Sequence, residues 1–347
     1  MKTYATMFLC GSKKSSPQGH CPHFLATTMI DQATSITLLQ QSFASTKIEK
    51  MKIIVTGSLG RISQPLTKEL VQKGHAVTVI SSKTEKQKDI KALGATAAIG
   101  SLQDVDFLTA TFTAADAVYC MVPPANYMDH GLDLAAYCNN IANNYARAIR
   151  ESGVKRVIHL SSIGAHLEKD SGIILFHRNV ETILGSLPDV NITFMRPTAF
   201  HYNLYAFIPV IKNTGSMSSN YGADDKIVWV APADIAAAIA DEIVTPLSGR
   251  KVRYVGSDEL SCHEVARILG AAIGKPGLTW ELITDEQMQN RLGSIGMNPM
   301  IAVGLVEMQA SMHSGRFFED YYLNRPSSLG KTKMTDFAKE FAAAFNQ

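Results

Sequence analysis

Two glycines, Gly57 and Gly60, lie between a β-branched run at Lys52–Val55 and a segment with helical apolar spacing at Ile62–Gln72. Gly57 permits a tight turn, and Gly60 lets the backbone come close to a bulky anion, against which the helix directs its free N–H groups. The strand–turn–helix context predicts a dinucleotide phosphate site, whereas the glycines alone would also fit an ordinary turn. The residues expected at the phosphates are Thr56, Gly57, Ser58, Leu59, Gly60, Arg61 and Ile62.

The residues after the second expected strand, His75–Ile80, bear on which nicotinamide dinucleotide the chain prefers. An acidic residue there would bind the ribose hydroxyls and repel a 2′-phosphate. Instead the chain continues Ser81-Ser82-Lys83. Two hydroxyls and an ammonium are suited to holding a phosphate, so we expect NADP(H) to be favoured over NAD(H). The alternative is that Lys83 is only the first solvated residue of a loop.

Strands and helices alternate from Met51 to Met195, which is the pattern of right-handed crossovers in a doubly wound parallel sheet. Later expected elements include a strand at Ala117–Val122 and a helix at Ile173–Leu187. We therefore expect an α/β, Rossmann-type core over 51–200. Most of 201–347 is expected to form a smaller substrate-closing lobe, with some elements returning to the sheet. Asp234 is expected to cap a helix.

The overall composition excludes several classes of protein. The 347 residues include 33 Lys and Arg against 31 Asp and Glu, a net charge of +2 that does not favour nucleic-acid binding. No apolar run approaches the roughly 18–20 residues that cross a bilayer. Five cysteines without a C-x-x-C pair indicate neither a disulfide framework nor a zinc site, so no metal is expected and the cytoplasm is the expected compartment.

Residues 1–50 differ in composition from the rest of the chain. Their first acidic residue is Asp31, and no arginine precedes Arg61. The segment is too polar for a secretory signal and lacks the arginines of a mitochondrial transit peptide. We expect a disordered extension, or a segment upstream of a natural start at Met51, and a short amphipathic helix at 35–43 stays open as an alternative.

Four segments carry a resemblance to a known family. They are the run from Lys52 to the Gly60 turn, the stretch Val154–Ser162 after Asp116–Tyr119, and Met195–Phe200 followed by Asn203. Together they resemble the NmrA-like family, a branch of atypical short-chain dehydrogenases/reductases. The resemblance is strong up to about Asn203 and implies NAD(P) binding. It also implies one of three roles: NADPH-dependent quinone reduction, reduction of plant phenolic ethers, or redox sensing without catalysis.

The Tyr-x-x-x-Lys pair of ordinary short-chain dehydrogenases is absent at the corresponding helix. Ile173 stands at the tyrosine position and His177 at the lysine position, with Glu181 four residues later, as in some quinone reductases of the family. Alcohol oxidation needs a base that Ile173 cannot supply, whereas a quinone accepts hydride readily. His177 is a candidate catalytic residue that contacts the nicotinamide ribose or donates a proton. A structural role beneath the cofactor is the alternative.

Other candidates follow from where the resemblance places them. Ser162, after the fifth strand, is expected to bond a substrate oxygen or to cap a turn. Val122 and Pro123 are expected along the cofactor, although Pro123-Pro124 could serve only to stiffen the loop. The expected substrate-pocket residues, which could instead be packing residues, are Tyr127, Phe200, Tyr202 and Asn203, with Tyr205 near them.

Three functions are compatible with these residues. The first is an NADPH-dependent reductase of a quinone or similar conjugated carbonyl, a small-molecule substrate. The second is a catalytically silent NADP(H)-binding redox sensor that acts through a protein partner. The third, an epimerase of sugar nucleotides, is disfavoured because such enzymes use the missing tyrosine as their base. A homodimer through the long helix at Leu132–Ser152 is possible for this architecture.

Overall fold

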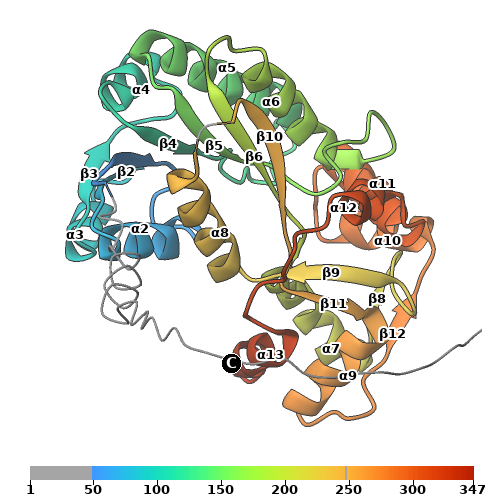
Figure 1. Cartoon of the computed structure of the whole chain (residues 1–347). Coiled ribbons are helices and arrows are strands. Elements are labelled where there is room, and N and C mark those ends of the chain that lie inside the picture. Colours follow the sequence, from blue (N-terminus) through green and yellow to red (C-terminus); the bar gives the residue numbers. More distant parts are fainter. Residues whose placement is uncertain (1–48, 247) are drawn as a thin grey trace, which may run out of the picture. The chain divides into compact units, whose positions relative to one another are not determined.

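A computed structural model describes residues 49–246 and 248–347 of the chain (Figure 1). The expected extension therefore lies outside the described residues except for its last two positions. The helix considered at 35–43 lies wholly outside them.

The described residues form a seven-stranded sheet in the order β10-β6-β5-β4-β1-β2-β3, and every strand pair in it is parallel. Its strands are β1 (Lys52–Val55), β2 (Ala76–Ser81), β3 (Thr96–Ile99), β4 (Ala117–Cys120), β5 (Arg156–Leu160), β6 (Asn191–Pro197) and β10 (Arg250–Val255). The order reverses at β1, and ligands of such sheets bind where the carboxyl ends of the strands diverge. The expectation of a Rossmann-type doubly wound sheet is confirmed.

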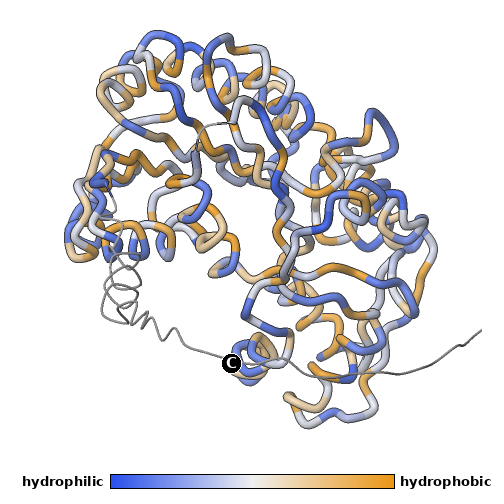
Figure 2. Tube along the Cα trace, in the orientation of Figure 1, coloured by the Kyte–Doolittle hydropathy of each residue, from blue (hydrophilic) through white to orange (hydrophobic). Residues whose placement is uncertain are grey.

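Helices cover both faces of this sheet, whose central strands β1, β4 and β5 bury apolar residues on both sides (Figures 1 and 2). One face packs against α4 (Val105–Phe112), α5 (Leu134–Ser152) and α6 (Leu175–Gly185). The other packs against α2 (Ser63–Gln72), α3 (Lys86–Ala92) and α8 (Pro232–Val244). Alternate residues of one strand enter different cores: Val157 of β5 faces the α5–α6 side, and Ile158 faces the α2–α8 side.

A second group of elements follows β6. It holds a three-stranded sheet ordered β11-β9-β7 and a two-stranded sheet of β12 and β8. Its strands are β7 (Ala199–Phe200), β8 (Met217–Ser219), β9 (Lys226–Val230), β11 (Asp258–Ser261) and β12 (Trp280–Leu282). Its helices are α7 (Ile208–Thr214), α9 (Cys262–Ala272), α10 (Asp285–Ser294), α11 (Pro299–His313), α12 (Glu319–Leu323) and α13 (Met334–Phe345), with short 3-10 helices η3 (His201–Phe207) and η4 (Arg316–Phe318). Most of these elements enclose a second core around Trp229 and Trp280, whereas α10 and the first part of α11 pack into the core shared with α5 and α6.

Two expected elements differ in detail. The helix expected at Ile173–Leu187 is divided into a 3-10 turn, η2 (Gly172–Ile174), and α6, which ends at Gly185. Gly172 has φ +53°, and a Cβ there would lie 1.7 Å from the carbonyl oxygen of Gly304 on α11, so the close approach of the two backbones at the start of η2 requires a glycine. The strand expected at Ala117–Val122 ends two residues earlier, at Cys120.

The expectation that Asp234 caps a helix is wrong. Ala231 occupies the N-cap of α8, and Asp234 lies within its first turn. The Asp234 carboxylate instead accepts hydrogen bonds from the Ser257 hydroxyl and from the backbone N–H groups of Lys331 and Thr332, at 2.6, 3.1 and 3.0 Å. It therefore attaches the segment before α13 to the large sheet.

Within residues 49–246 and 248–347, no helix is both long and apolar enough to cross a membrane. The same part of the chain brings no three His, Cys, Asp or Glu side chains together in a group that could hold a metal ion.

Candidate functional site

The turn between β1 and α2 has the backbone conformation that its glycine pattern predicts. Gly57 has φ +84°, and a Cβ there would lie 2.7 Å from Ser63 Oγ. Ser58 also has positive φ, at 54°. The Thr56 hydroxyl accepts a hydrogen bond from the Met121 N–H at 3.1 Å, which fixes the turn against the end of β4.

Ser63, which replaces the third glycine of the pattern, is accommodated under the turn. It is buried, and its hydroxyl donates to the Thr56 carbonyl at 2.8 Å. The side chain therefore takes the space beside Gly57 and pairs its own polar atom, so α2 still packs closely on β1. Ile62 is buried beside it.

The turn leaves several backbone donors free. Gly60 N–H donates to the Gly57 carbonyl at 3.1 Å, but the N–H groups of Leu59, Arg61 and Ile62 have no acceptor among the described residues. A Cβ added at Gly60 would meet only the Gly57 carbonyl within 4 Å. Free donors at the start of a ten-residue helix, with open space beside them, fit a pyrophosphate.

At the end of β2, the last strand residue, Ser81, stabilises the turn, whereas the next two residues face solvent. Ser81 is buried; its Oγ accepts from Ser58 Oγ at 2.9 Å and from the Lys83 N–H at 3.2 Å. Ser82 and Lys83 are exposed, and Lys83 forms no ion pair with any described residue. Lys83 is thus the cation available to a phosphate here, whereas the Ser81 hydroxyl is already engaged.

A layer of two histidines lies between β5 and α6. His159 pairs in register with Phe194 of β6, and their rings meet edge to face with centroids 6.2 Å apart. Both ring nitrogens of His159 are buried without a hydrogen-bond partner in the described chain, and so is Nδ1 of His177. Burial lowers the pKa of His159 to about 3 and that of His177 to about 4, and each histidine is neutral at pH 7.

The next layer toward the carboxyl ends of the strands is an ion-pair network. Arg196 donates to both carboxylate oxygens of Glu181, from Nε at 2.9 Å and from Nη2 at 2.7 Å. The same carboxylate accepts from the Ser161 hydroxyl at 2.5 Å. Arg196 Nη1 reaches Asp320 Oδ2 of α12 and the Tyr254 hydroxyl, both at 3.1 Å. The network therefore connects the helix that carries His177 to an element of the smaller lobe.

Ser162 and Ile173, the two other positions considered for catalysis, lie in different surroundings. Ser162, directly after Ser161, is half-buried, and its hydroxyl forms no hydrogen bond with the described residues. Ile173 packs against α11, where its Cγ2 would lie 2.9 Å from a Cβ on Gly304. An apolar contact therefore occupies the position that a tyrosine takes in ordinary short-chain dehydrogenases.

The expected aromatic residues form a cluster that reaches the phosphate turn. Phe200 and Tyr202 stack with centroids 4.9 Å apart and planes inclined by 23°. The Arg61 guanidinium carbon lies 5.1 Å from the Tyr202 ring centroid and 5.9 Å from that of Tyr205. Burial raises the pKa of Tyr202 to about 12, Arg61 opposes this rise, and Tyr127 adds to it. Asn203 is exposed and makes no hydrogen bond with the described residues.

Two tyrosines of α5 donate hydrogen bonds to the loop after β4. Tyr145 donates its hydroxyl to the Met121 carbonyl at 2.8 Å, and Tyr137 donates to the Pro123 carbonyl at 3.2 Å. Val122 and Pro123 are half-buried at this point. These two hydrogen bonds fix the position of the loop between the end of β4 and the start of α5.

The model of the NmrA-like family matches residues 49–338, which is most of the chain. The chain belongs to this family. No curated protein matches its sequence. A crystal structure of an NADPH-dependent quinone oxidoreductase from Escherichia coli, complexed with NADPH, is similar with a TM-score of 0.69 and 21% identity, over 83% of this chain and 99% of that one.

Two other solved structures show the same fold. A triphenylmethane reductase from Citrobacter sp., complexed with NADP(H), has a TM-score of 0.67 and 18% identity, over 83% of this chain and 99% of that one. A nucleoside-diphosphate-sugar epimerase from Staphylococcus aureus has a TM-score of 0.67 and 16% identity, over 83% of this chain and 100% of that one. At such identities the likeness establishes the fold alone.

Within this NmrA-like fold, sequence reasoning missed most of the buried polar network. In the sequence, Glu181 stands out only by its spacing from His177, and Arg196 and His159 only as members of the Met195–Phe200 and Val154–Ser162 segments. No sequence pattern points to Tyr254 or Asp320. A usable signal exists for two of them, because Arg196 and His159 are polar residues inside otherwise apolar buried strands.

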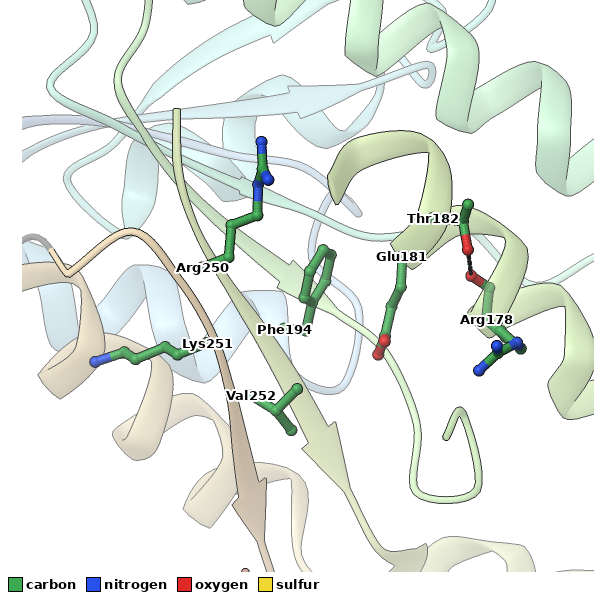
Figure 3. Close-up of a pocket in the computed structure, with 7 residues that line it drawn as sticks. All are labelled: Arg178, Glu181, Thr182, Phe194, Arg250, Lys251 and Val252. Carbon is green, nitrogen blue, oxygen red and sulfur yellow. Dashed lines mark hydrogen bonds between the residues drawn. The ribbon is translucent and has the colours of Figure 1, made fainter. Parts of the chain in front are cut away.

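A shallow cavity of about 420 Å³ opens on the other side of this network, between α6 and the strands β6 and β10 (Figure 3). The cations that line it are Arg178, Arg250 and Lys251. Each already has a partner: Glu168 at 2.6 Å, the Leu187 carbonyl at 2.5 Å and Glu242 at 2.7 Å, respectively. The cavity lies toward the amino end of β10, away from the carboxyl ends where the turn lies, and holds no free cation for a ligand.

Proposed function

We propose that this protein is an NADPH-dependent reductase of a quinone or a similar conjugated carbonyl. The observation that carries the proposal is a contrast between the two parts of the site, the phosphate turn and the position of the missing tyrosine. The phosphate turn is ready for a dinucleotide, while Ile173, packed on α11, takes the place of the tyrosine base. A hydride acceptor that needs no strong base suits such a site better than an alcohol does.

The preference for NADPH rests on the residues after β2. No carboxylate follows the strand, and the exposed ammonium of Lys83 is unpaired among the described residues, so it is available to a 2′-phosphate. When bound, the reduced nicotinamide supplies a hydride. The turn supplies free N–H groups to the pyrophosphate.

The protein's own groups then orient the acceptor and manage its protons. Phe200 and Tyr202 form a stacked pair against which a flat ring can lie. The free hydroxyl of Ser162 is available to a substrate oxygen. Because His177 is neutral at pH 7, it acts as a hydrogen-bond donor and not as an imidazolium acid. The proton for the product oxygen then comes from water.

The comparisons support the same class of activity. The similar structures from Escherichia coli and Citrobacter sp. are named as a quinone oxidoreductase and a triphenylmethane reductase, and they were solved with NADPH and NADP(H). By their names, the first acts on quinones and the second reduces triphenylmethane compounds. An epimerase shares the fold, but this chain lacks the tyrosine that such chemistry uses.

The test measures loss of absorbance by NADPH, with NADH in parallel, when a panel of quinones is added to the full chain. We expect NADPH-preferring turnover with at least one quinone. His177→Ala should lower kcat, whereas the matched control His263→Ala, which changes an exposed histidine of α9, should not. No oxidation of either dinucleotide by any quinone would contradict the reductase.

A redox sensor without turnover is the second candidate. It is favoured by one observation: burial keeps His177 neutral at pH 7, so this histidine supplies no imidazolium to protonate a product. A sensor would bind NADP+ and NADPH tightly and consume neither. Calorimetric titration with both forms, beside the quinone assay, separates the two candidates.

A further inference from the structure

Arg61 belongs to the phosphate turn in sequence and to the aromatic cluster in space. Its backbone N–H is one of the free donors of the turn. Its guanidinium lies over the Tyr202 ring at 5.1 Å and near the Tyr205 ring at 5.9 Å. The side chain is exposed and forms no ion pair with a described carboxylate. One residue thus spans the two parts of the proposed site.

The guanidinium has two possible partners of unequal strength. A cation over an aromatic ring at an exposed position is held weakly. Charge-assisted hydrogen bonds from arginine to a phosphate are stronger and can be bidentate. A dinucleotide bound at the free N–H groups would bring its phosphates next to the residue that bears this guanidinium. The arginine would then exchange the ring for the phosphate.

The ring that Arg61 covers is the one best suited to a flat substrate. Tyr202 is half-buried and already stacks with Phe200, so its orientation is restrained on one side by another aromatic ring. An electron-rich phenol favours stacking with an electron-poor planar ring, as a quinone has. A guanidinium on the ring competes with that contact.

We propose that Arg61 is a cofactor-responsive latch on the substrate site. Without a dinucleotide its guanidinium covers Tyr202, and with a dinucleotide it pairs with the phosphates and opens the ring to a flat, electron-poor substrate. The inference rests on the proposed function and adds a binding order to it, with the dinucleotide first and the aromatic substrate second. It also makes Arg61 a determinant of substrate affinity as well as of cofactor affinity.

The test measures binding without turnover, using NADP+ and 2-methyl-1,4-naphthoquinone as probes in calorimetric titrations of the full chain. We expect wild-type protein to bind the naphthoquinone at least tenfold more tightly when saturated with NADP+. Arg61→Ala should bind it with the tighter affinity in the absence of NADP+, and with no further gain on saturation. Lys68→Met, which removes an exposed charge from α2 far from the rings, should behave as wild type.

A second readout follows the ring itself. Tyr202→Trp places a fluorophore under the guanidinium, and we expect NADP+ to change its emission. The same addition should leave the emission of the Tyr202→Trp, Arg61→Ala double variant unchanged relative to the background from Trp229 and Trp280.

The outcomes separate the latch from the proposed function. If NADP+ binds but the naphthoquinone affinity of wild type is independent of it, the latch is overturned and the cofactor site stands. If wild type and Arg61→Ala gain equally from NADP+, the latch is overturned as well. If NADP+ does not bind at all, the proposed function fails and the latch fails with it. No naphthoquinone binding in any state overturns the assigned substrate class.

Discussion

The two ends of the proposed site are built in opposite ways. The phosphate end consists of consecutive residues, Thr56–Ser63, that leave N–H groups and space open to solvent. The helix end gathers side chains from β5, α6, β6, β10 and α12, and most of its polar groups already satisfy one another. The first end is organised to receive charge from outside. The second neutralises its own charge and presents little beyond the half-buried His177 and Ser162.

This difference predicts that the two ends fail differently when altered. A change at the helix end should cost stability first, because it leaves buried groups unpaired. A change at the phosphate end should cost ligand binding first, because the N–H groups of Leu59, Arg61 and Ile62 have no acceptor among the described residues to lose.

Arg196→Met should have the largest effect on stability. It removes the cation between Glu181 and Asp320, whose side chains are 11% and 29% exposed, and we expect a loss of about 3–5 kcal/mol in the free energy of unfolding, chiefly through Glu181. Urea denaturation measures it. The same substitution at Arg147, in an exposed pair with Glu151, is the control and should have little effect on the free energy of unfolding, because solvent screens this pair. Equal costs would show that the buried network contributes nothing special.

Gly57→Ala tests the phosphate end. The positive φ of 84° costs an alanine about 1–2 kcal/mol, and its Cβ would also lie 2.7 Å from Ser63 Oγ. We expect NADP+ binding to weaken by at least tenfold in calorimetric titration, because the turn must shift. Gly74→Ala has a similar φ of 88° with nothing within 4 Å, so it should cost similar stability and leave NADP+ binding unchanged. A loss of binding in both variants would assign the effect to stability alone.

The same difference explains how far the sequence could predict the structure. The turn is a local device: Gly57, Gly60 and the flanking strand and helix lie within about twenty residues, and their spacing alone indicates the geometry. The alternation of strands and helices likewise indicates a doubly wound parallel sheet, because parallel strands need right-handed crossovers. This prediction of the fold is confirmed.

The helix end could not be predicted in this way, because its partners are far apart in the chain. Arg196 donates a hydrogen bond to Asp320, which is 124 residues away in the sequence, and Gly172 contacts Gly304 at a similar separation in sequence. Spacing rules for single elements carry no information on such pairs. Ser81 shows the same limit on a smaller scale: its type suggests a phosphate ligand, but its hydroxyl is turned inward to Ser58 by tertiary packing.

The buried histidines of the helix end predict a dependence of stability on pH. Burial lowers the pKa of His159 from 6.5, its value in the unfolded chain, to about 3 in the folded protein. Between these two pH values the unfolded chain binds a proton at this residue, and the folded chain does not. Stability therefore falls as the pH falls through this window, by about 2 kcal/mol between pH 7 and pH 5 for one such group. His177 and His201, with pKa values of about 4, add in the same direction.

His159→Phe checks this expectation through the slope and not through absolute stability. The number of protons taken up on unfolding near pH 5, obtained from urea denaturation at several pH values, should decrease by roughly one. His263→Phe, at an exposed position, should leave the slope as in wild type. An unchanged slope in His159→Phe would mean that His159 is protonated in the folded protein, and that its ring nitrogens have partners such as buried water.

Lys83→Ala should have the smallest effect on stability and a selective effect on binding. Lys83 is exposed and unpaired among the described residues, so we expect a change within about 0.5 kcal/mol in the free energy of unfolding. Affinity for NADP+ should fall about tenfold, because one charge-assisted contact to the 2′-phosphate is lost, while affinity for NAD+ stays the same. Lys86→Ala, three residues away and paired with Asp89 at 3.3 Å, is the matched control and should change neither affinity.

Equal weakening of both dinucleotides would place Lys83 at the shared part of the cofactor. No weakening would make it a solvated loop residue, and the preference for NADPH would then have to come from Ser82 or from Arg61. The phosphate turn and the loop after β2 are thus the parts of the molecule where a substitution can change ligand choice without changing the fold, because the N–H groups of the turn and the Lys83 ammonium have no partner among the described residues.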